Sequence, residues 1–146
     1  LGLPDNDLTS PLNYKVIRYA DVLLMAAEAH NRNGNDGLAL QYVNQVRGRV
    51  NMPAISSSGS QLTEDIWKER RYELSCEGLR FFDLVRWGIA SEVLNKYNEV
   101  EATKRVYKNG AKFVKGKNEY FPIPQEAIDR SEKDGKATLV QDSAYQ

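Results

Sequence analysis

Cysteine and histidine are nearly absent from this sequence of 146 residues, which contains one of each, Cys76 and His30. A single cysteine cannot form an internal disulfide, and the two residues are too few for a zinc site of the usual cysteine and histidine ligands. No Ser–His–Asp triad can be assembled around the lone histidine, so we expect neither a metal nor another cofactor. We predict that Cys76 is a small buried side chain in a helix and that His30 lies on a helix face near its C-terminal end.

An excess of charge of one sign and a long apolar run are also missing. Lysine plus arginine and aspartate plus glutamate each number 20, so the net charge is zero, which argues against a general nucleic-acid binder. The longest apolar run, VLLMAA at residues 22–27, is far too short to span a bilayer. The first residues, LGLPDNDLTSPLN, show no signal peptide. The length suits one domain, and we expect residues 1–146 to be a fragment of a longer protein.

Helical spacing of apolar residues runs through most of the chain. It predicts five helices, at residues 19–32, 37–50, 63–77, 79–87 and 90–98. Thr63 is the expected N-cap of the third helix, and Gly78 is the expected break after it. The first two helices place small and apolar residues at tetratricopeptide-like spacings, Ala27 in the first and Ala39, Val43 and Val46 in the second, whose apolar side also includes Tyr42 and Val50. Such a pair cannot bury its faces alone, so either the third helix covers it or repeats are missing.

The last third of the chain has a different pattern. Asn109-Gly110 lies between short alternating runs, which predicts a hairpin. The FPIP segment at residues 121–124 must be extended because each proline restricts the residue before it, and QEAIDR at residues 125–130 is typical of a short helix. The expected fold is mainly α, with a tetratricopeptide-like helix pair, further helices and an irregular or hairpin C-terminal segment.

Residues 69–88, ERRYELSCEGLRFFDLVRWG, alternate charges with bulky apolar groups. On one helix, Glu73 and Glu77 would lie a turn apart, a separation at which paired carboxylates hydrolyse glycosides. However, Arg70 and Arg80 lie three residues from these acids and would lower their pKa, which is the wrong direction for a general acid. We therefore favour a structural network of ion pairs, in which Asp83 is at least half buried and paired with its flanking arginines.

Lysine and arginine gather around two aromatic residues later in the chain. The basic residues are Lys104, Arg105, Lys108, Lys112, Lys115 and Lys117, and the aromatic residues are Tyr107 and Phe113. Interleaved cations and aromatics could track a single nucleic-acid strand. A hairpin with a solvated lysine-rich face produces the same pattern, since lysines protect exposed strand edges. With zero net charge, we favour the second interpretation and expect no nucleic-acid partner.

Four segments together resemble the C-terminal end of the SusD/RagB family. In chain order they are RYADVLLMAAEAHNRNG, ALQYVNQVRGRV, IWKERRYELSCEGLRFFDLVRWG and YFPIP. The resemblance extends from about Tyr14 to Tyr145, and its longest motif is ER-x-x-EL-x-x-EG-x-R-x-x-DL-x-RWG. The residues that match this signature are Glu69, Arg70, Glu73, Glu77, Arg80, Asp83, Arg86 and Trp87. The ending QDSAY differs from the family's usual Q-N-x-G-Y.

The resemblance implies a non-enzymatic, mostly helical lipoprotein on the surface of the outer membrane. It implies binding of glycans such as starch, or of other nutrients, and delivery of oligosaccharide to a SusC-like TonB-dependent channel. Whole members are several-fold longer and begin with a lipidated cysteine, so the membrane contact would be a lipid anchor that this chain does not contain. We interpret the signature as the framework of the fold.

Glycan recognition in such proteins relies on aromatic platforms. Trp67 and Trp87 lie on apolar helix faces and are expected in the core, whereas Tyr97, Tyr107 and Tyr120 are the candidates for stacking on sugar rings. Two alternatives remain: a tetratricopeptide-like adaptor that binds other proteins, and a glycosidase that uses the acid pair described above.

Overall fold

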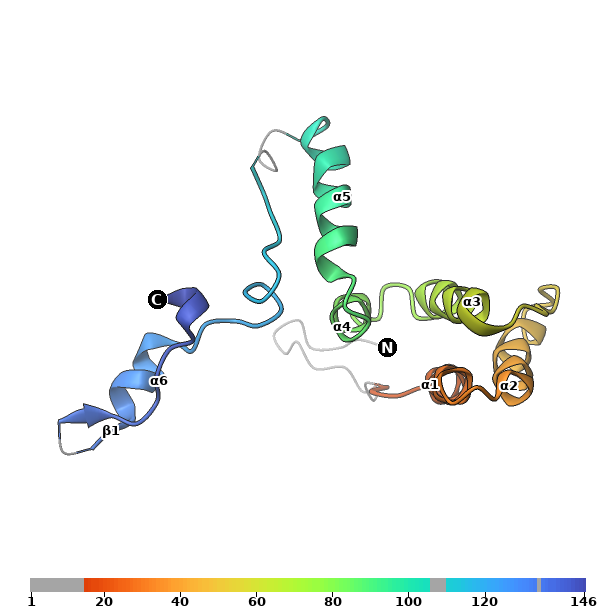
Figure 1. Cartoon of the computed structure of the whole chain (residues 1–146), viewed down its shortest axis with the longest axis horizontal. Helices are drawn as coiled ribbons and strands as arrows, with labels where there is room; N and C mark the ends of the chain where they lie inside the picture. The colour runs from red at the N-terminus through yellow and green to blue at the C-terminus, as the bar shows by residue number, and fades with distance from the viewer. Residues whose placement is uncertain (1–14, 106–109, 134) are drawn as a thin grey trace, which may run out of the picture. The chain divides into compact units, whose positions relative to one another are not determined.

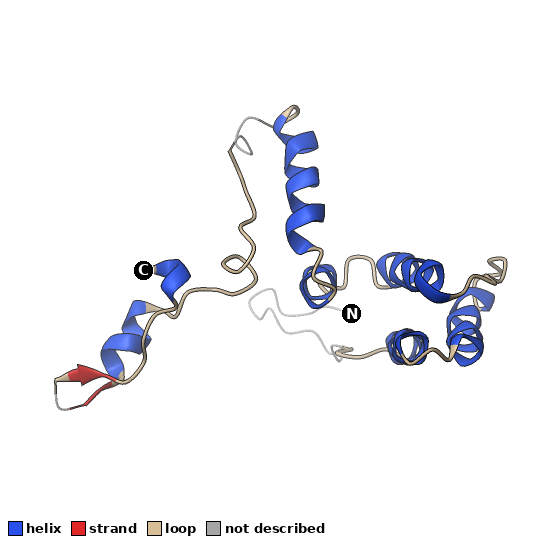
Figure 2. Ribbon diagram, in the orientation of Figure 1, coloured by secondary structure: helices blue, strands red, loops and turns tan. Residues whose placement is uncertain are grey.

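The computed structural model describes residues 15–105, 110–133 and 135–146 (Figure 1). Helices account for most of the regular structure (Figure 2). The elements are α1 (Tyr19–Arg32), α2 (Asp36–Gly48), α3 (Gly59–Glu73), α4 (Arg80–Arg86), α5 (Ala90–Ala102), α6 (Gln125–Arg130), β1 (Glu132–Lys133), β2 (Lys136–Ala137) and the 3-10 helix η2 (Ser143–Tyr145). The expected mainly α fold is confirmed.

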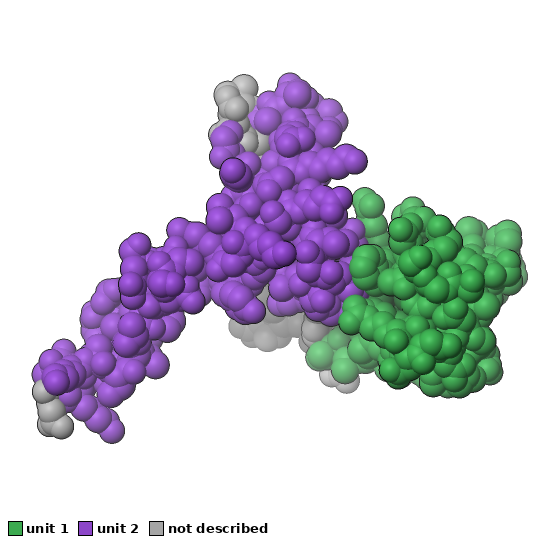
Figure 3. All heavy atoms as spheres, in the orientation of Figure 1, with its two compact units in different colours: residues 1–78 green, residues 79–146 purple. Residues whose placement is uncertain are grey.

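The chain divides into two compact units, Leu1–Gly78 and Leu79–Gln146 (Figure 3). In the first unit, α1 packs on α2, and α3 packs on both. Their shared core contains six side chains with 0% exposure, two from each helix: Leu24, Ala27, Ala39, Val43, Leu62 and Ile66. The third helix therefore covers the tetratricopeptide-like pair, which was the first of the two alternatives expected from the sequence.

The observed helix boundaries correct three predictions in this unit. Helix α3 begins at Gly59 rather than Thr63, and the Thr63 hydroxyl donates to the side chain of Asn31 instead of capping the helix. Helix α3 ends at Glu73, so Cys76 lies beyond it in a turn, exposed and with φ +66°. Helix α2 ends at Gly48, which leaves Val50 outside the apolar face and half exposed. His30 lies near the end of α1, as predicted.

A polar network joins the ends of the three helices. The buried side chain of Asn31 donates to the Asp36 carboxylate and to the Gly59 carbonyl. The second oxygen of Asp36 accepts the Gly59 amide, and these hydrogen bonds lower the pKa of Asp36. Since a buried amide is costly when unpaired, the network fixes where α2 and α3 begin relative to the end of α1.

The second unit contains α4, α5 and the C-terminal segments. Its buried apolar residues include Leu84, Trp87, Ala90 and Phe113. Phe113 lies in a segment without strand structure, and this segment is held by the Asn95 amide of α5, which accepts the Phe113 amide and donates to its carbonyl. Side-chain hydrogen bonds thus replace strand pairing here.

The predicted hairpin at Asn109-Gly110 is only partly testable, because Asn109 lies outside the described residues. On the described side of this turn, residues 111–114 form no strand. The paired strands in the described ranges are β1 and β2, which run antiparallel with Glu132 opposite Ala137. Pro124 has an extended backbone (φ −56°, ψ 135°), residues 121–124 form neither helix nor strand, and α6 is the short helix that was predicted.

Candidate functional site

The three tyrosines proposed as sugar platforms have different environments. Tyr97 lies on α5 with 48% of its surface exposed, and Tyr120, ahead of the FPIP segment, is 73% exposed. Tyr107 lies outside the described residues. Tyr97 and Tyr120 line neither of the two pockets discussed next. Their role as platforms stays a prediction.

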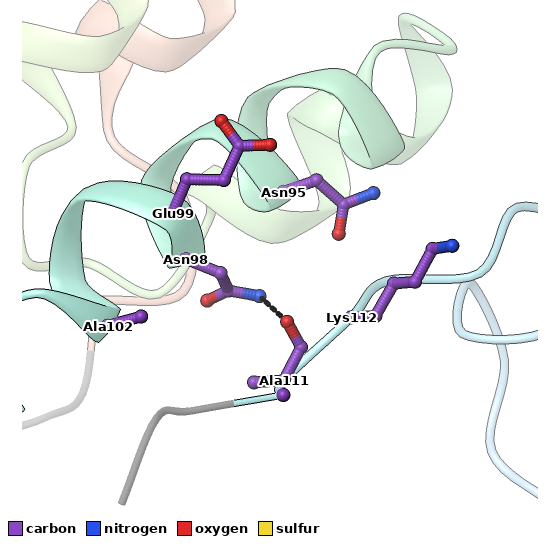
Figure 4. A pocket seen from close by; sticks show the side chains of 7 residues that line it. Asn95, Asn98, Glu99, Ala102, Ala111 and Lys112 are labelled. Carbon is purple, nitrogen blue, oxygen red and sulfur yellow. Dashed lines mark hydrogen bonds between the residues drawn. The ribbon is translucent and has the colours of Figure 1, made fainter. Parts of the chain in front are cut away.

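A pocket of about 400 Å³ lies between α5 and the segment that follows it in the second unit (Figure 4). We call it the α5 pocket. It is lined by Asn95, Asn98, Glu99, Ala102, Gly110, Ala111 and Lys112. Its volume is at the lower end of the range of small-molecule sites, about 300–1,000 Å³.

Two of the polar side chains hold the α5 pocket together. Asn98 donates through Nδ2 to the Ala111 carbonyl at 3.2 Å (Figure 4), and Asn95 fixes the backbone of Phe113. Among the described residues, Glu99 and Lys112 have no hydrogen-bond or ion-pair partner. This site was not predicted from the sequence, although spacings of three, four and seven residues from Asn95 place its helical residues on one unusually polar face of α5.

A second pocket, of about 390 Å³, lies beside α1 in the first unit. Its lining includes Tyr19, Leu23 and Val46 between two arginines, Arg18 and Arg49. Both arginines donate to the carboxylate of Glu73. Because these cations already have a protein partner, this pocket offers less unsatisfied polar chemistry than the α5 pocket.

In the first unit, the signature residues pair with groups outside their own stretch. Glu69 pairs with Arg47 at 2.6 Å, and Arg70 pairs with Asp21 at 2.8 Å. Thus the predicted pairing of Arg70 with a glutamate one turn later is wrong, because Arg70 is turned toward α1. The network instead ties α3 to the other two helices.

Arg18, just ahead of α1, joins two signature acids. Its guanidinium contacts Glu77 at 2.6 Å and Glu73 at 2.9 Å, and Arg49 also contacts Glu73. The hydrogen bonds that Arg18 donates to Glu77 and then to Glu73 raise the pKa of Arg18. The predicted partner of Glu77 was Arg80, and the observed partner differs because α3 ends before Glu77 and leaves it in a turn that reaches Arg18.

The electrostatics of Glu73 oppose the glycosidase alternative. Burial disfavours its charged form, but hydrogen bonds from Arg18 and Arg49 outweigh burial and lower the pKa of Glu73. A general acid needs a raised pKa, so a carboxylate held in this way is unsuited to protonate a leaving group.

Acid should weaken the first unit through Glu73. Because its folded pKa lies below its ordinary value of 4.5, its ionised form adds stability that is complete above that pH and is lost as the pH falls through the folded pKa. We expect Glu73→Gln to flatten the decrease in unfolding free energy below about pH 4.5, as measured by urea unfolding across pH. Glu64→Gln, at an exposed position of α3, is the matched control. Parallel profiles for wild type and Glu73→Gln would contradict this assignment.

In the second unit, the signature surrounds Trp87. Asp83 is 4% exposed and accepts a hydrogen bond from Arg86 Nε at 2.9 Å. The guanidinium groups of Arg86 and Arg80 lie over the Trp87 ring, 5.0 and 5.6 Å from its centroid, where cation–π attraction adds to packing. The expected burial of Asp83 and its pairing with Arg86 are both present, and Trp87 is buried as predicted.

The described residues contain no group of three or more histidine, cysteine, aspartate or glutamate side chains arranged to hold a metal ion. Within the same part of the chain, no helix has the length and apolar character needed to cross a membrane.

Comparison with known proteins agrees with the resemblance found in the sequence. The model of the SusD family matches residues 5–145. The chain belongs to the SusD family.

Relatives and solved structures support this membership. The chain is 38% identical to SusD-like protein P38 of Formosa agariphila over 59% of its own length and 19% of the relative's. It is 36% identical to a SusD-like protein of Bacteroides ovatus, over 66% of this chain and 19% of the relative. The crystal structure of a SusD superfamily protein from Bacteroides vulgatus matches with a TM-score of 0.65 and 37% identity over 77% of this chain and 24% of that one. The chain therefore spans about a fifth of the length of its curated relatives.

Proposed function

We propose that this chain belongs to a glycan- or nutrient-binding component of an outer-membrane uptake system. The observation that carries the proposal is the SusD family match over residues 5–145. The protein would be a surface-exposed lipoprotein that passes oligosaccharide to a SusC-like TonB-dependent channel. The chain covers 19% of two curated relatives, and its resemblance to the C-terminal end of the family supports residues 1–146 as a C-terminal domain of a longer protein.

The signature residues would act as architecture in this protein and not as a reaction centre. Support comes from their contacts: Glu69, Arg70 and Asp83 are buried and ion-paired, and each links or stabilises helices. Ligand recognition would then fall to more exposed groups, among them Tyr97 and Tyr120, and Tyr107 outside the described residues. Such a protein binds its ligand and releases it unchanged.

Affinity electrophoresis tests the proposal. The protein should be retarded in native gels that contain a polysaccharide such as starch, xylan or mannan, and free oligosaccharide should reverse the retardation. Binding to a peptide or protein without a carbohydrate response would favour the adaptor alternative. Hydrolysis of glycosides that is lost in Glu73→Gln would establish the glycosidase instead.

A further inference from the structure

The α5 pocket contains charged groups that the fold leaves unused. Among the described residues, the Glu99 carboxylate and the Lys112 ammonium make no hydrogen bond and no ion pair. Glu101, two residues along the same helix, is by contrast engaged by Lys104 and Arg105 at 3.8 and 3.2 Å. Glu92, elsewhere on α5, also lacks such a partner in the described part of the chain, but Glu99 differs from it in lining the pocket.

The wall opposite α5 is held in place by side-chain hydrogen bonds. Asn95 binds the backbone of Phe113 at 2.7 and 3.0 Å, and Asn98 binds the carbonyl of Ala111. In the chain, Lys112 lies between these two anchored residues, and it lines the pocket (Figure 4). Because its backbone is fixed on both sides, Lys112 is held on the wall of the pocket that faces α5 and Glu99, at low cost in conformational entropy.

The free groups define the chemistry of a ligand. A carboxylate accepts hydrogen bonds from two adjacent hydroxyls, and an ammonium donates to hydroxyl or ring oxygens. The side chains of Ala102 and Ala111, which also line the pocket, are small and leave room in it. One acid and one base give no net charge, so an anionic ligand would meet the Glu99 carboxylate as well as the cation.

We propose that the α5 pocket binds a short segment of a neutral glycan, with Glu99 accepting from sugar hydroxyls and Lys112 donating to sugar oxygens. This inference rests on the proposed glycan-binding function and adds a specific site to it. Tyr97 does not line the pocket, so recognition there depends on hydrogen bonds and not on stacking against that ring.

The test combines removal of each group with steric filling of the pocket. Glu99→Ala and Lys112→Ala delete the two charges, and Ala102→Leu fills the space with another residue that is well tolerated in helices. Each should weaken binding at least tenfold, measured by retardation in gels of the neutral polysaccharide that retards wild type. Exposed residues provide matched controls: Glu92→Ala on α5 and Lys115→Ala on the same segment as Lys112 should bind as wild type.

The outcomes distinguish failure of the proposed site from failure of the proposed function. Unchanged unfolding midpoints in circular dichroism would show that the variants fold. If wild type is retarded and the three pocket variants are retarded equally, the α5 pocket is not the site, while the proposed function stands. If wild type is retarded only by uronic-acid polysaccharides, the neutral-glycan assignment is overturned. If no polysaccharide retards wild type, the proposed function itself fails.

Discussion

The Arg70→Met variant is expected to lose about 3–5 kcal/mol of unfolding free energy, the usual cost of breaking a buried ion pair. The side chains of Arg70 and Asp21 are 5% and 12% exposed, and they meet at 2.8 Å between α3 and α1. Methionine keeps much of the apolar volume of arginine but leaves the Asp21 carboxylate in a poorly hydrated site. The destabilisation therefore comes mainly from the unpaired charge, and urea unfolding would measure it.

Two further variants isolate the cause. Arg71→Met makes the same chemical change at the next residue, which is exposed, and should cost less than about 1 kcal/mol. Adding Asp21→Asn to Arg70→Met removes the unpaired charge and should recover part of the loss, which a double-mutant cycle would quantify. Equal stability of Arg70→Met and Arg71→Met would contradict the buried pair.

Asp83→Asn should lower the unfolding free energy by about 2–3 kcal/mol, somewhat less than a fully buried pair would. Asparagine nearly preserves the shape of Asp83 but removes its charge from beside Arg86. The side chain of Asp83 is 6% exposed whereas that of Arg86 is 41% exposed, so water partly compensates the arginine.

Asp129→Asn is the control for Asp83→Asn, because it makes the same substitution at an exposed position of α6. A solvated pair is worth roughly 0–1 kcal/mol, and the control should remain within that range. An Asp83→Asn protein as stable as the control in urea would show that the pair contributes little to the fold.

The helices could be predicted from the sequence because their apolar residues repeat with helical spacing. The range 19–32 was predicted to the residue, and the third helix was correctly expected to carry much of the charged stretch. The ends of α3 were harder to predict from the sequence. Its start depends on the hydrogen bonds of Asn31 and Asp36, which belong to other helices. Local patterns cannot reveal such distant partners, which is also why Cys76 was wrongly placed in a helix.

The ion pairs also could not be predicted from local sequence patterns. Spacing along one helix suggested partners within residues 69–88, yet Arg70 pairs with Asp21, and Glu69 pairs with Arg47. These pairs join residues that become neighbours only after α1, α2 and α3 pack. The α5 pocket was missed for the same reason, since its second wall, which includes Lys112, is brought to α5 by the amides of Asn95 and Asn98.

The central claim is that the charged signature builds the fold while other groups bind the ligand. Its most direct test measures urea unfolding and polysaccharide retardation on the same preparations of Arg70→Met and Asp83→Asn. The account predicts lower unfolding free energies for both variants and, in conditions where each remains folded, retardation equal to that of wild type. Unchanged unfolding together with lost retardation would make these residues part of the ligand site and would contradict the account.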